Sequence, residues 1–317
     1  MTMTITGFDR VRGRVWQDRE LAETVSGVVC LDRCPVAVIS TTAEGGGGQA
    51  PDEPDAAPYR FTEQGRSSFP LSGSREVRVL TAVSPEDAVV EERDADGRTH
   101  LRIIRPTGSE RVAVPYSDYG WVMSPDGNAA LAFTTQRDPK QGRLLRFTRD
   151  PDGWKPDGAG LEWGTVSDVC LAGQGETALV TGAQAALVRG MSERHPLEPA
   201  LAQAAECALG TSAAALVMRS MDMQGGFRTV VHGLGPDGRS TWKRELATEA
   251  GVTAHPTQPY IGVSDGRTFT VLDAEGEVAR STDGVATARF VADGRLVVVT
   301  PDGDVEWMSA EPADLAQ

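Results

Sequence analysis

Residues 120–134 read GWVMSPDGNAALAFT, and residues 288–300 read ARFVADGRLVVVT. Each stretch combines an apolar strand, a short turn with Asp-Gly and a second apolar run, which is the pattern of a β-hairpin. The two turns begin at Ser124 and Val291, which are 167 residues apart. A hairpin that returns at such a distance indicates an internal repeat.

The same hairpin can be found seven times along the chain. The other five copies are residues 27–40, 79–92, 168–182, 206–219 and 251–265. Aligned on their turns, the copies begin at Leu31, Ser84, Ser124, Ala172, Gly210, His255 and Val291, a mean spacing of about 43 residues. The four-stranded blade of a β-propeller repeats every 40–45 residues or so. The sequence therefore predicts an all-β, seven-bladed β-propeller with four-stranded blades.

The rest of each unit fits a blade. Most hairpins are followed by another strand, a glycine turn and an edge strand, and these turns fall at Gly108, Gly153, Gly238 and Gly276. The second strands, such as residues 36–39, 216–218 and 296–299, are continuously apolar, as expected for strands buried on both faces. The fourth strands, such as residues 240–245, alternate and carry charge, as an outer edge should.

These patterns predict one propeller domain over residues 1–317. The expected blades are residues 27–73, 76–117, 119–163, 166–200, 203–246, 249–283 and 285–310. The last unit is too short for a fourth strand, so we expect the N-terminal strand, residues 10–16, to complete it and close the ring. The alternative is a β-sandwich followed by a second domain.

Residues 41–58, TTAEGGGGQAPDEPDAAP, interrupt the first blade. The segment is rich in glycine, proline and acidic residues, which predicts a flexible, solvated insertion. The alternative is an arm that becomes ordered on a partner.

Composition limits the partners. The formal net charge is −14 and no basic run occurs, which disfavours nucleic acid. No apolar run is long enough for a membrane span. The N-terminal residues lack the pattern of a signal peptide, so the expected location is the cytoplasm, where Cys30, Cys34, Cys170 and Cys207 would be buried free thiols and not metal ligands.

The units resemble the WD-repeat and quinoprotein-like β-propeller superfamily. Residues 124–127, SPDG, are similar to the common turn of WD-type blades, and residues 237–242, DGRSTW, are similar to the outer strand of quinoprotein-type repeats. The resemblance covers nearly the whole chain as a blade pattern. The stacking and calcium-binding residues of a quinone site have no match, so we expect no cofactor and interpret Trp242 as a packing residue.

No motif favours catalysis by this chain. Residues 233–238, GLGPDG, match the dinucleotide fingerprint, but a charged strand follows where a helix is required, so we predict a hairpin turn. The four histidines, His100, His195, His232 and His255, fall in different blades. A metal-dependent lactonase or hydrolase acting at the central channel remains the alternative, and three or more carboxylate, histidine or asparagine side chains converging there would favour it.

The candidate binding residues lie in loops that a propeller gathers on one face. They are Tyr116, Asp118 and Tyr119 in PYSDYG, Arg137 in TTQRDPKQG, and Met221 and Met223 in RSMDMQGG. Tyrosine, arginine and methionine are typical of protein interfaces. The alternatives are that the tyrosines pack against a neighbouring blade and that the methionines are tucked under their own turn.

Our interpretation is a non-catalytic interaction platform, a scaffold or adaptor within a multi-protein bacterial system. The arginine-rich, lysine-poor composition, with abundant alanine and glycine, indicates a high-GC bacterial genome. The negative charge favours a basic protein as the partner.

Overall fold

The computed structural model describes residues 3–9, 13–21, 24–31, 36–42, 58–62, 65–68, 74–82, 88–94, 99–105, 108–112, 119–124, 128–134, 142–150, 153–158, 160–173, 175–221, 227–246, 248–290, 294–302 and 305–308. The chain forms two compact units, Met1–Met123 and Ser124–Gln317, and each is described by itself.

Unit 1 consists of antiparallel strands. A two-stranded sheet contains β1 (Met3–Asp9) and β2 (Gly13–Leu21). The next sheet has the order β3 (Thr24–Leu31), β4 (Val36–Thr42), β5 (Pro58–Thr62) and β6 (Gly65–Ser68). A third has the order β7 (Ser74–Ala82), β8 (Ala88–Asp94), β9 (Thr99–Arg105) and β10 (Gly108–Arg111), and β11 (Tyr119–Met123) ends the unit.

Unit 2 continues the pattern over five sheets. The first contains β12 (Ala129–Thr134), β13 (Arg143–Asp150) and β14 (Gly153–Pro156), with β15 (Leu161–Glu162) also paired to β13. The second contains β16 (Val166–Ala172), β17 (Thr177–Gly182), β18 (Ala186–Arg189) and β19 (Glu193–Pro196). A short 3-10 helix, η1 (Pro199–Gln203), follows.

The remaining sheets of unit 2 keep the chain order. The third contains β20 (Glu206–Leu209), β21 (Ala214–Met221), β22 (Phe227–Leu234) and β23 (Ser240–Leu246). The fourth contains β24 (Gly251–Ala254), β25 (Ile261–Ser264), β26 (Thr268–Leu272) and β27 (Val278–Asp283). The last contains β28 (Thr287–Phe290), β29 (Leu296–Val299) and β30 (Val305–Met308).

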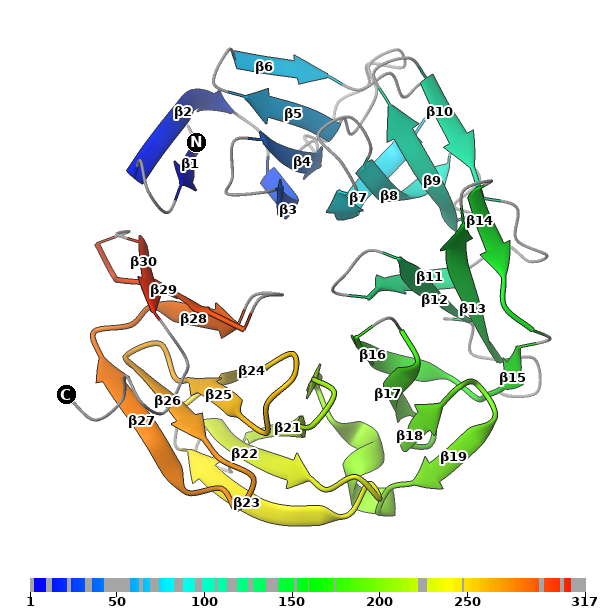
Figure 1. The fold of residues 1–317 in the computed structure, drawn as a ribbon, viewed down its shortest axis with the longest axis vertical. Coiled ribbons are helices and arrows are strands. Elements are labelled where there is room, and N and C mark those ends of the chain that lie inside the picture. The colour runs from blue at the N-terminus through cyan, green and yellow to red at the C-terminus, as the bar shows by residue number, and fades with distance from the viewer. Residues whose placement is uncertain are drawn as a thin grey trace. The chain divides into compact units, whose positions relative to one another are not determined.

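Within unit 2 the sheets follow one another in chain order (Figure 1). The first strand of each sheet contacts the first strand of the next, from β16 to β20, β24 and β28. The strand pairs within these sheets are antiparallel, as consecutive hairpins require. The prediction of an all-β fold made of four-stranded antiparallel sheets is confirmed.

Burial follows the predicted order of strands. The four central residues of β17 are buried, as are the first four of β12 and of β21, so both faces of these strands are covered. The outer strand β23 alternates between half-buried and exposed residues, as predicted. Trp242 on β23 packs into the core, and its ring covers Gly233 and Gly276, where a Cβ would collide with it. Its interpretation as a packing residue is confirmed.

The predicted turns also appear. Residues 235–239 join β22 to β23, and Gly238 has φ = 80°, so GLGPDG forms a hairpin turn and does not open a helix. Gly276 has φ = 81° in the turn before β27. Both positions lie in the left-handed region, where glycine is unstrained.

Two expected boundaries differ. Residues 10–16 were expected to form one strand, but β2 begins at Gly13 and pairs with β1, because Thr4, Ile5 and Thr6 give the preceding segment strand propensity of its own. The acidic insertion was expected at residues 41–58, but β4 extends through Thr42 and β5 begins at Pro58. Residues 43–57 lie outside the described residues. In the part of the chain described, no helix is long and apolar enough to cross a bilayer.

Candidate functional site

Of the six predicted binding residues, only Met221 has a described side chain. Tyr119 is the first residue of β11, and its side chain is not among those described. Tyr116, Asp118, Arg137 and Met223 lie outside the described residues. That the six residues share one surface stays a prediction.

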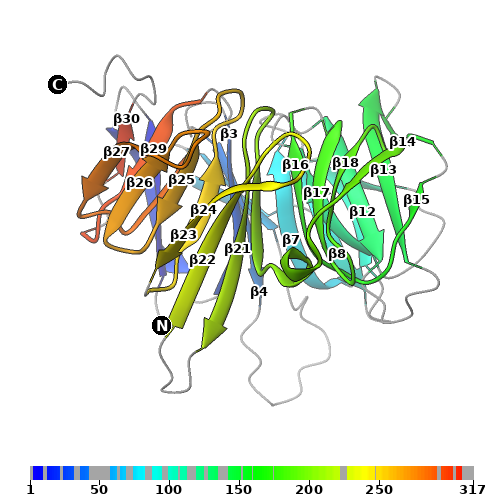
Figure 2. The same ribbon diagram turned by 90° about the horizontal axis from the view of Figure 1, so that it is seen from below.

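Met221 lies at the end of a hairpin that is longer than its neighbours. Strands β21 and β22 have eight residues each, whereas β24 and β25 have four. The first four residues of β21 are buried, but its last three are exposed, and the Met221 side chain is 66% exposed. Figure 2 shows this hairpin reaching further down than β24 and β25. The hairpin therefore extends beyond the buried part of its sheet, and Met221 lies in the extension.

Salt bridges flank this exposed end. The Arg219 guanidinium lies 2.7 Å from Glu206 Oε2 and donates to the Ala250 carbonyl oxygen at 3.1 Å. Arg228, opposite Ser220 in the register, lies 2.5 Å from Glu245 Oε2. The Arg228 guanidinium lowers the pKa of the exposed Glu245 carboxyl. Met221 is therefore an apolar side chain among paired charges.

A second set of contacts joins neighbouring sheets through backbone N–H groups that lie on first strands. Three backbone N–H groups, each three residues before the turn of its hairpin, donate to a carboxylate from the preceding sheet. These bonds run from Trp121 to Glu91 at 3.1 Å, from Cys207 to Asp168 at 3.0 Å and from Val252 to Glu206 at 3.2 Å. Strands β20 and β24 are edge strands, whose outward N–H groups have no strand partner, so the carboxylates satisfy them.

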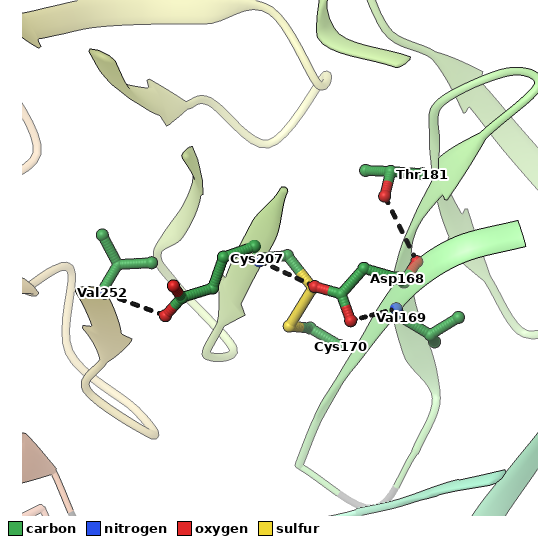
Figure 3. Close-up of a disulfide and its surroundings, with 7 residues drawn as sticks. Asp168, Val169, Cys170, Thr181, Cys207 and Val252 are labelled. Atoms are coloured by element: carbon green, nitrogen blue, oxygen red, sulfur yellow. Dashed lines mark hydrogen bonds between the residues drawn. A yellow bond between two sulfur atoms is a disulfide. The ribbon is translucent and has the colours of Figure 1, made fainter. Parts of the chain in front are cut away.

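Asp168 is one of the two unit 2 carboxylates in this set, and both of its oxygens accept backbone hydrogen bonds. One oxygen accepts from the N–H of Val169 at 2.9 Å and the other from the N–H of Cys207 (Figure 3). Burial raises the pKa of the Asp168 carboxyl, these two hydrogen bonds lower it, and the charge of Glu206 raises it; the net direction is upward.

Cys170 on β16 and Cys207 on β20 form a disulfide, with their Cα atoms 5.9 Å apart (Figure 3). The prediction that these two cysteines are free thiols is wrong. The physical reason is that the first strands of successive sheets lie side by side, which brings together residues 37 apart in sequence. The side chains of Cys30 and Cys34 lie outside the described part of the chain.

His255 joins two turns of unit 2. It lies in the predicted turn, between β24 and β25, and is only 5% exposed. Its Nδ1 accepts hydrogen bonds from the N–H groups of Thr257 at 3.2 Å and Gln258 at 2.9 Å. Burial lowers the pKa of His255, partly offset by a hydrogen bond with the backbone of Gly294, which precedes β29.

A cavity of about 180 Å³ lies between the second and third sheets of unit 2. Its lining includes the apolar Leu187 and Leu209 and the polar Thr177 and Thr211. Arg189 also lines it, and the Arg189 guanidinium donates to the Pro236 carbonyl oxygen at 2.8 Å. No carboxylate or histidine lines this cavity. It does not have the ligand set that a metal-dependent hydrolase would require.

The hydrolase alternative called for three or more carboxylate, histidine or asparagine side chains together. Within the described residues, the one group of three histidine, cysteine or acidic side chains with metal-binding spacing is Asp168, Cys170 and Cys207. It contains a single carboxylate, so no described feature favours the hydrolase.

The chain matches no protein-family model and no curated protein. It is similar to solved structures. One is BamB from Moraxella catarrhalis, at 14% identity and a TM-score of 0.55, covering 97% of this chain and 89% of that one. The similar structures are β-propellers and include quinoprotein-like and WD-repeat types as well as the propellers of prolyl oligopeptidases. The fold is that of a β-propeller.

Two further similar propellers were solved in protein complexes. Sqt1 from Chaetomium thermophilum, bound to the N-terminus of the ribosomal protein L10, is 12% identical with a TM-score of 0.50, covering 91% of this chain and 88% of that one. A chain of the mitotic checkpoint complex is 9% identical with a TM-score of 0.53, covering 97% and 91%. At these identities the likeness shows the fold alone. The β-propeller fold that the resemblance implied is confirmed.

The carboxylates between sheets were not singled out from the sequence, although a signal was present. Asp168 and Glu206 each stand four residues before the turn of their hairpin, so they are equivalent in the aligned repeats. An acidic residue in an otherwise apolar first strand needs a partner. That requirement points to the unpaired N–H groups of the neighbouring edge strand.

Proposed function

We propose that this chain is a non-catalytic β-propeller platform that binds another protein. The observation that carries the proposal is the exposed end of the β21–β22 hairpin, where Met221 lies beyond the buried part of its sheet. Exposed methionine is adaptable binding surface. Propellers similar in fold include one solved with a ribosomal-protein segment and one from a checkpoint complex, which supports protein binding as a use of this fold.

We further propose seven blades in a closed ring. The sheets containing β3, β7, β12, β16, β20, β24 and β28 are the seven blades in this proposal. The last sheet has three strands in the described residues, and the β1–β2 hairpin would supply its fourth. Closure would remove two exposed sheet edges. In such a ring the loops that carry Tyr116, Asp118, Tyr119, Arg137, Met221 and Met223 open on one face.

The partner that suits this face is a basic protein. The net charge of −14 attracts a positively charged surface and repels nucleic acid. We propose a cytoplasmic location within a multi-protein bacterial assembly, where Cys170 and Cys207 would be exposed to cellular thiol reductants.

The experiment is capture of partners from the native host with the tagged chain and two variants. Met221→Asp places a charge on the exposed hairpin end. Ser212→Asp places the same charge on an exposed residue of the turn before β21, at the other end of that strand. We expect a partner captured by the wild type to be lost with Met221→Asp and kept with Ser212→Asp. Equal capture by both variants would contradict the proposed face.

A further inference from the structure

Asp168, Cys170 and Cys207 form a compact cluster at the junction of two sheets. Both sulfur atoms and a carboxylate oxygen lie within 4.8 Å of one another. Asp168 and Cys170 come from β16 and Cys207 from β20, so the cluster is assembled from two edge strands (Figure 3). Cys207 is buried, whereas Asp168 and Cys170 are half-buried, which leaves the cluster within reach of small solutes.

Reduction would turn this cluster into a set of metal ligands. A cellular dithiol reductant supplies two electrons and two protons, becomes a disulfide itself and leaves Cys170 and Cys207 as thiols. Two thiolates on one zinc ion, at Zn–S distances of about 2.3 Å, lie about 3.8 Å apart in tetrahedral geometry. With Cα atoms 5.9 Å apart, small side-chain rotations achieve that separation.

We propose that the reduced chain binds one zinc ion through Cys170 Sγ, Cys207 Sγ and an Asp168 oxygen, and that the disulfide and the metal site are alternative states of the same cluster. Binding releases the two thiol protons as the thiolates form bonds to the metal. Two soft thiolates with one carboxylate suit zinc, and three protein ligands leave the fourth tetrahedral position to water.

The surrounding charges favour a cation in the reduced state. Glu206 directly precedes Cys207 on β20, so a second carboxylate belongs to the same strand as one of the proposed ligands. Glu206 is itself held by Arg219 at 2.7 Å and by the N–H of Val252, so it is a neighbour of the site and not a ligand. Two thiolates beside these two carboxylates would repel one another, and a divalent cation relieves that repulsion.

Cobalt(II) tests the site because its thiolate complexes absorb light. The chain is reduced with a phosphine under inert gas, titrated with Co²⁺ and compared with the oxidised chain. We expect one equivalent with a thiolate-to-cobalt band in the reduced chain, displaced by Zn²⁺, and no band in the oxidised chain. No band after reduction would overturn the proposal.

Cys30 and Cys34 must be separated from this signal. Cys30→Ser/Cys34→Ser should keep the cobalt band, and Cys170→Ser/Cys207→Ser should lose it. The reverse pattern would place the metal on the other cysteines and overturn the proposal. Should Cys170→Ser/Cys207→Ser fail to fold, the band kept by Cys30→Ser/Cys34→Ser assigns the metal to Cys170 and Cys207, and loss of the band in that variant overturns the proposal.

The role of Asp168 needs a matched pair of variants. Asp168→Asn keeps an oxygen for the N–H of Cys207 but removes the charged ligand, and we expect zinc affinity to fall by about tenfold or more, since even indirect changes cost about 10–100-fold. Glu206→Gln removes a nearby charge without removing a ligand, so we expect this variant to lose less zinc affinity than Asp168→Asn. Equal losses would show that Asp168 acts only through its charge, which contradicts ligation.

Discussion

The carboxylate of Glu206 accepts a hydrogen bond from the backbone N–H of Val252 at 3.2 Å, so a side chain of one sheet satisfies the edge strand of the next. The other Glu206 oxygen is 2.7 Å from the Arg219 guanidinium. One acidic residue therefore joins β20 to β24 and fixes the exposed half of β21. Asp168 makes the equivalent bond one sheet earlier.

Replacing Glu206 should destabilise the fold. Glu206→Ala leaves the N–H of Val252 without its acceptor and Arg219 without this carboxylate, and we expect a loss of about 1–2 kcal/mol in the free energy of unfolding, since the site is partly exposed. Glu206→Gln keeps an oxygen for Val252 and should cost less. Urea unfolding measures both, with Glu245→Gln as a surface control that should change little. A Gln variant as unstable as the Ala variant would show that the hydrogen bond to Val252 contributes nothing.

His255 should make stability depend on pH. Its Nδ1 accepts two backbone hydrogen bonds, and protonation there would break both. Burial lowers its pKa in the folded chain, whereas an unfolded histidine titrates near about 6.5. The unfolded state thus binds more protons at mildly acidic pH, and stability present above about pH 6.5 is lost as the pH falls toward the folded value.

The measurement is urea unfolding at about pH 7.5 and about pH 5.5. We expect the wild type to lose up to about 1.4 kcal/mol over this range from His255, the linkage limit for a group that titrates near about 6.5 when unfolded. His232, whose pKa burial also lowers, contributes in the same direction and remains in the variant. His255→Asn should therefore reduce the pH dependence without abolishing it. An unchanged pH dependence would exclude His255 as its source.

Gly294 and Gly266 form a matched pair for the contact between turns. Both have φ in the left-handed region, at 83° and 81°. A Cβ at Gly294 would lie 2.6 Å from His255 Nε2, whereas a Cβ at Gly266 would meet nothing within 4 Å. Gly266→Ala should cost about 1–2 kcal/mol of backbone strain, and Gly294→Ala about 1–3 kcal/mol more from overpacking. In a His255→Ala background the two glycine variants should become equal, and a persistent difference in melting would contradict the contact.

The fold was predictable because its signals are local. Apolar runs such as residues 216–218 and turns such as Asp237-Gly238 specify strands and hairpins through propensity and backbone freedom, whatever lies beyond them. The disulfide was not predictable in this way. Cys170 and Cys207 meet because β16 and β20 lie side by side, a relationship between sheets that spacing along the chain does not contain. The repeat pattern correctly predicted that His255 lies in a turn. It did not predict the contact of His255 with Gly294, because Gly294 belongs to the next repeat.

Most of the candidate binding face remains a prediction. Met221 is exposed, as an interface residue must be. Tyr116, Asp118, Arg137 and Met223 fall in connections outside the described residues, where residue type predicts a use but no repeat pattern fixes a position. Loops differ from strands in this respect because their geometry depends on specific contacts and not on a period.

Ring closure can be tested by removing the N-terminal hairpin. Deleting residues 1–23 removes β1 and β2 and should expose an edge of the last sheet. We expect a loss of several kcal/mol in the free energy of unfolding and self-association through the exposed edge. Thermal unfolding and light scattering provide the readouts. A truncated chain that melts with the wild type and stays monomeric would exclude closure by this hairpin.

The most direct test of the platform proposal is the affinity for a captured partner, measured with the wild type and with Tyr119→Ala/Arg137→Ala. We predict that the double variant binds at least about 2 kcal/mol more weakly, close to 30-fold in Kd, while its melting temperature is unchanged. Added salt should weaken wild-type binding, because the expected partner is basic. An unchanged Kd for the double variant, together with a large loss for Ser212→Asp at the other end of β21, would contradict the account.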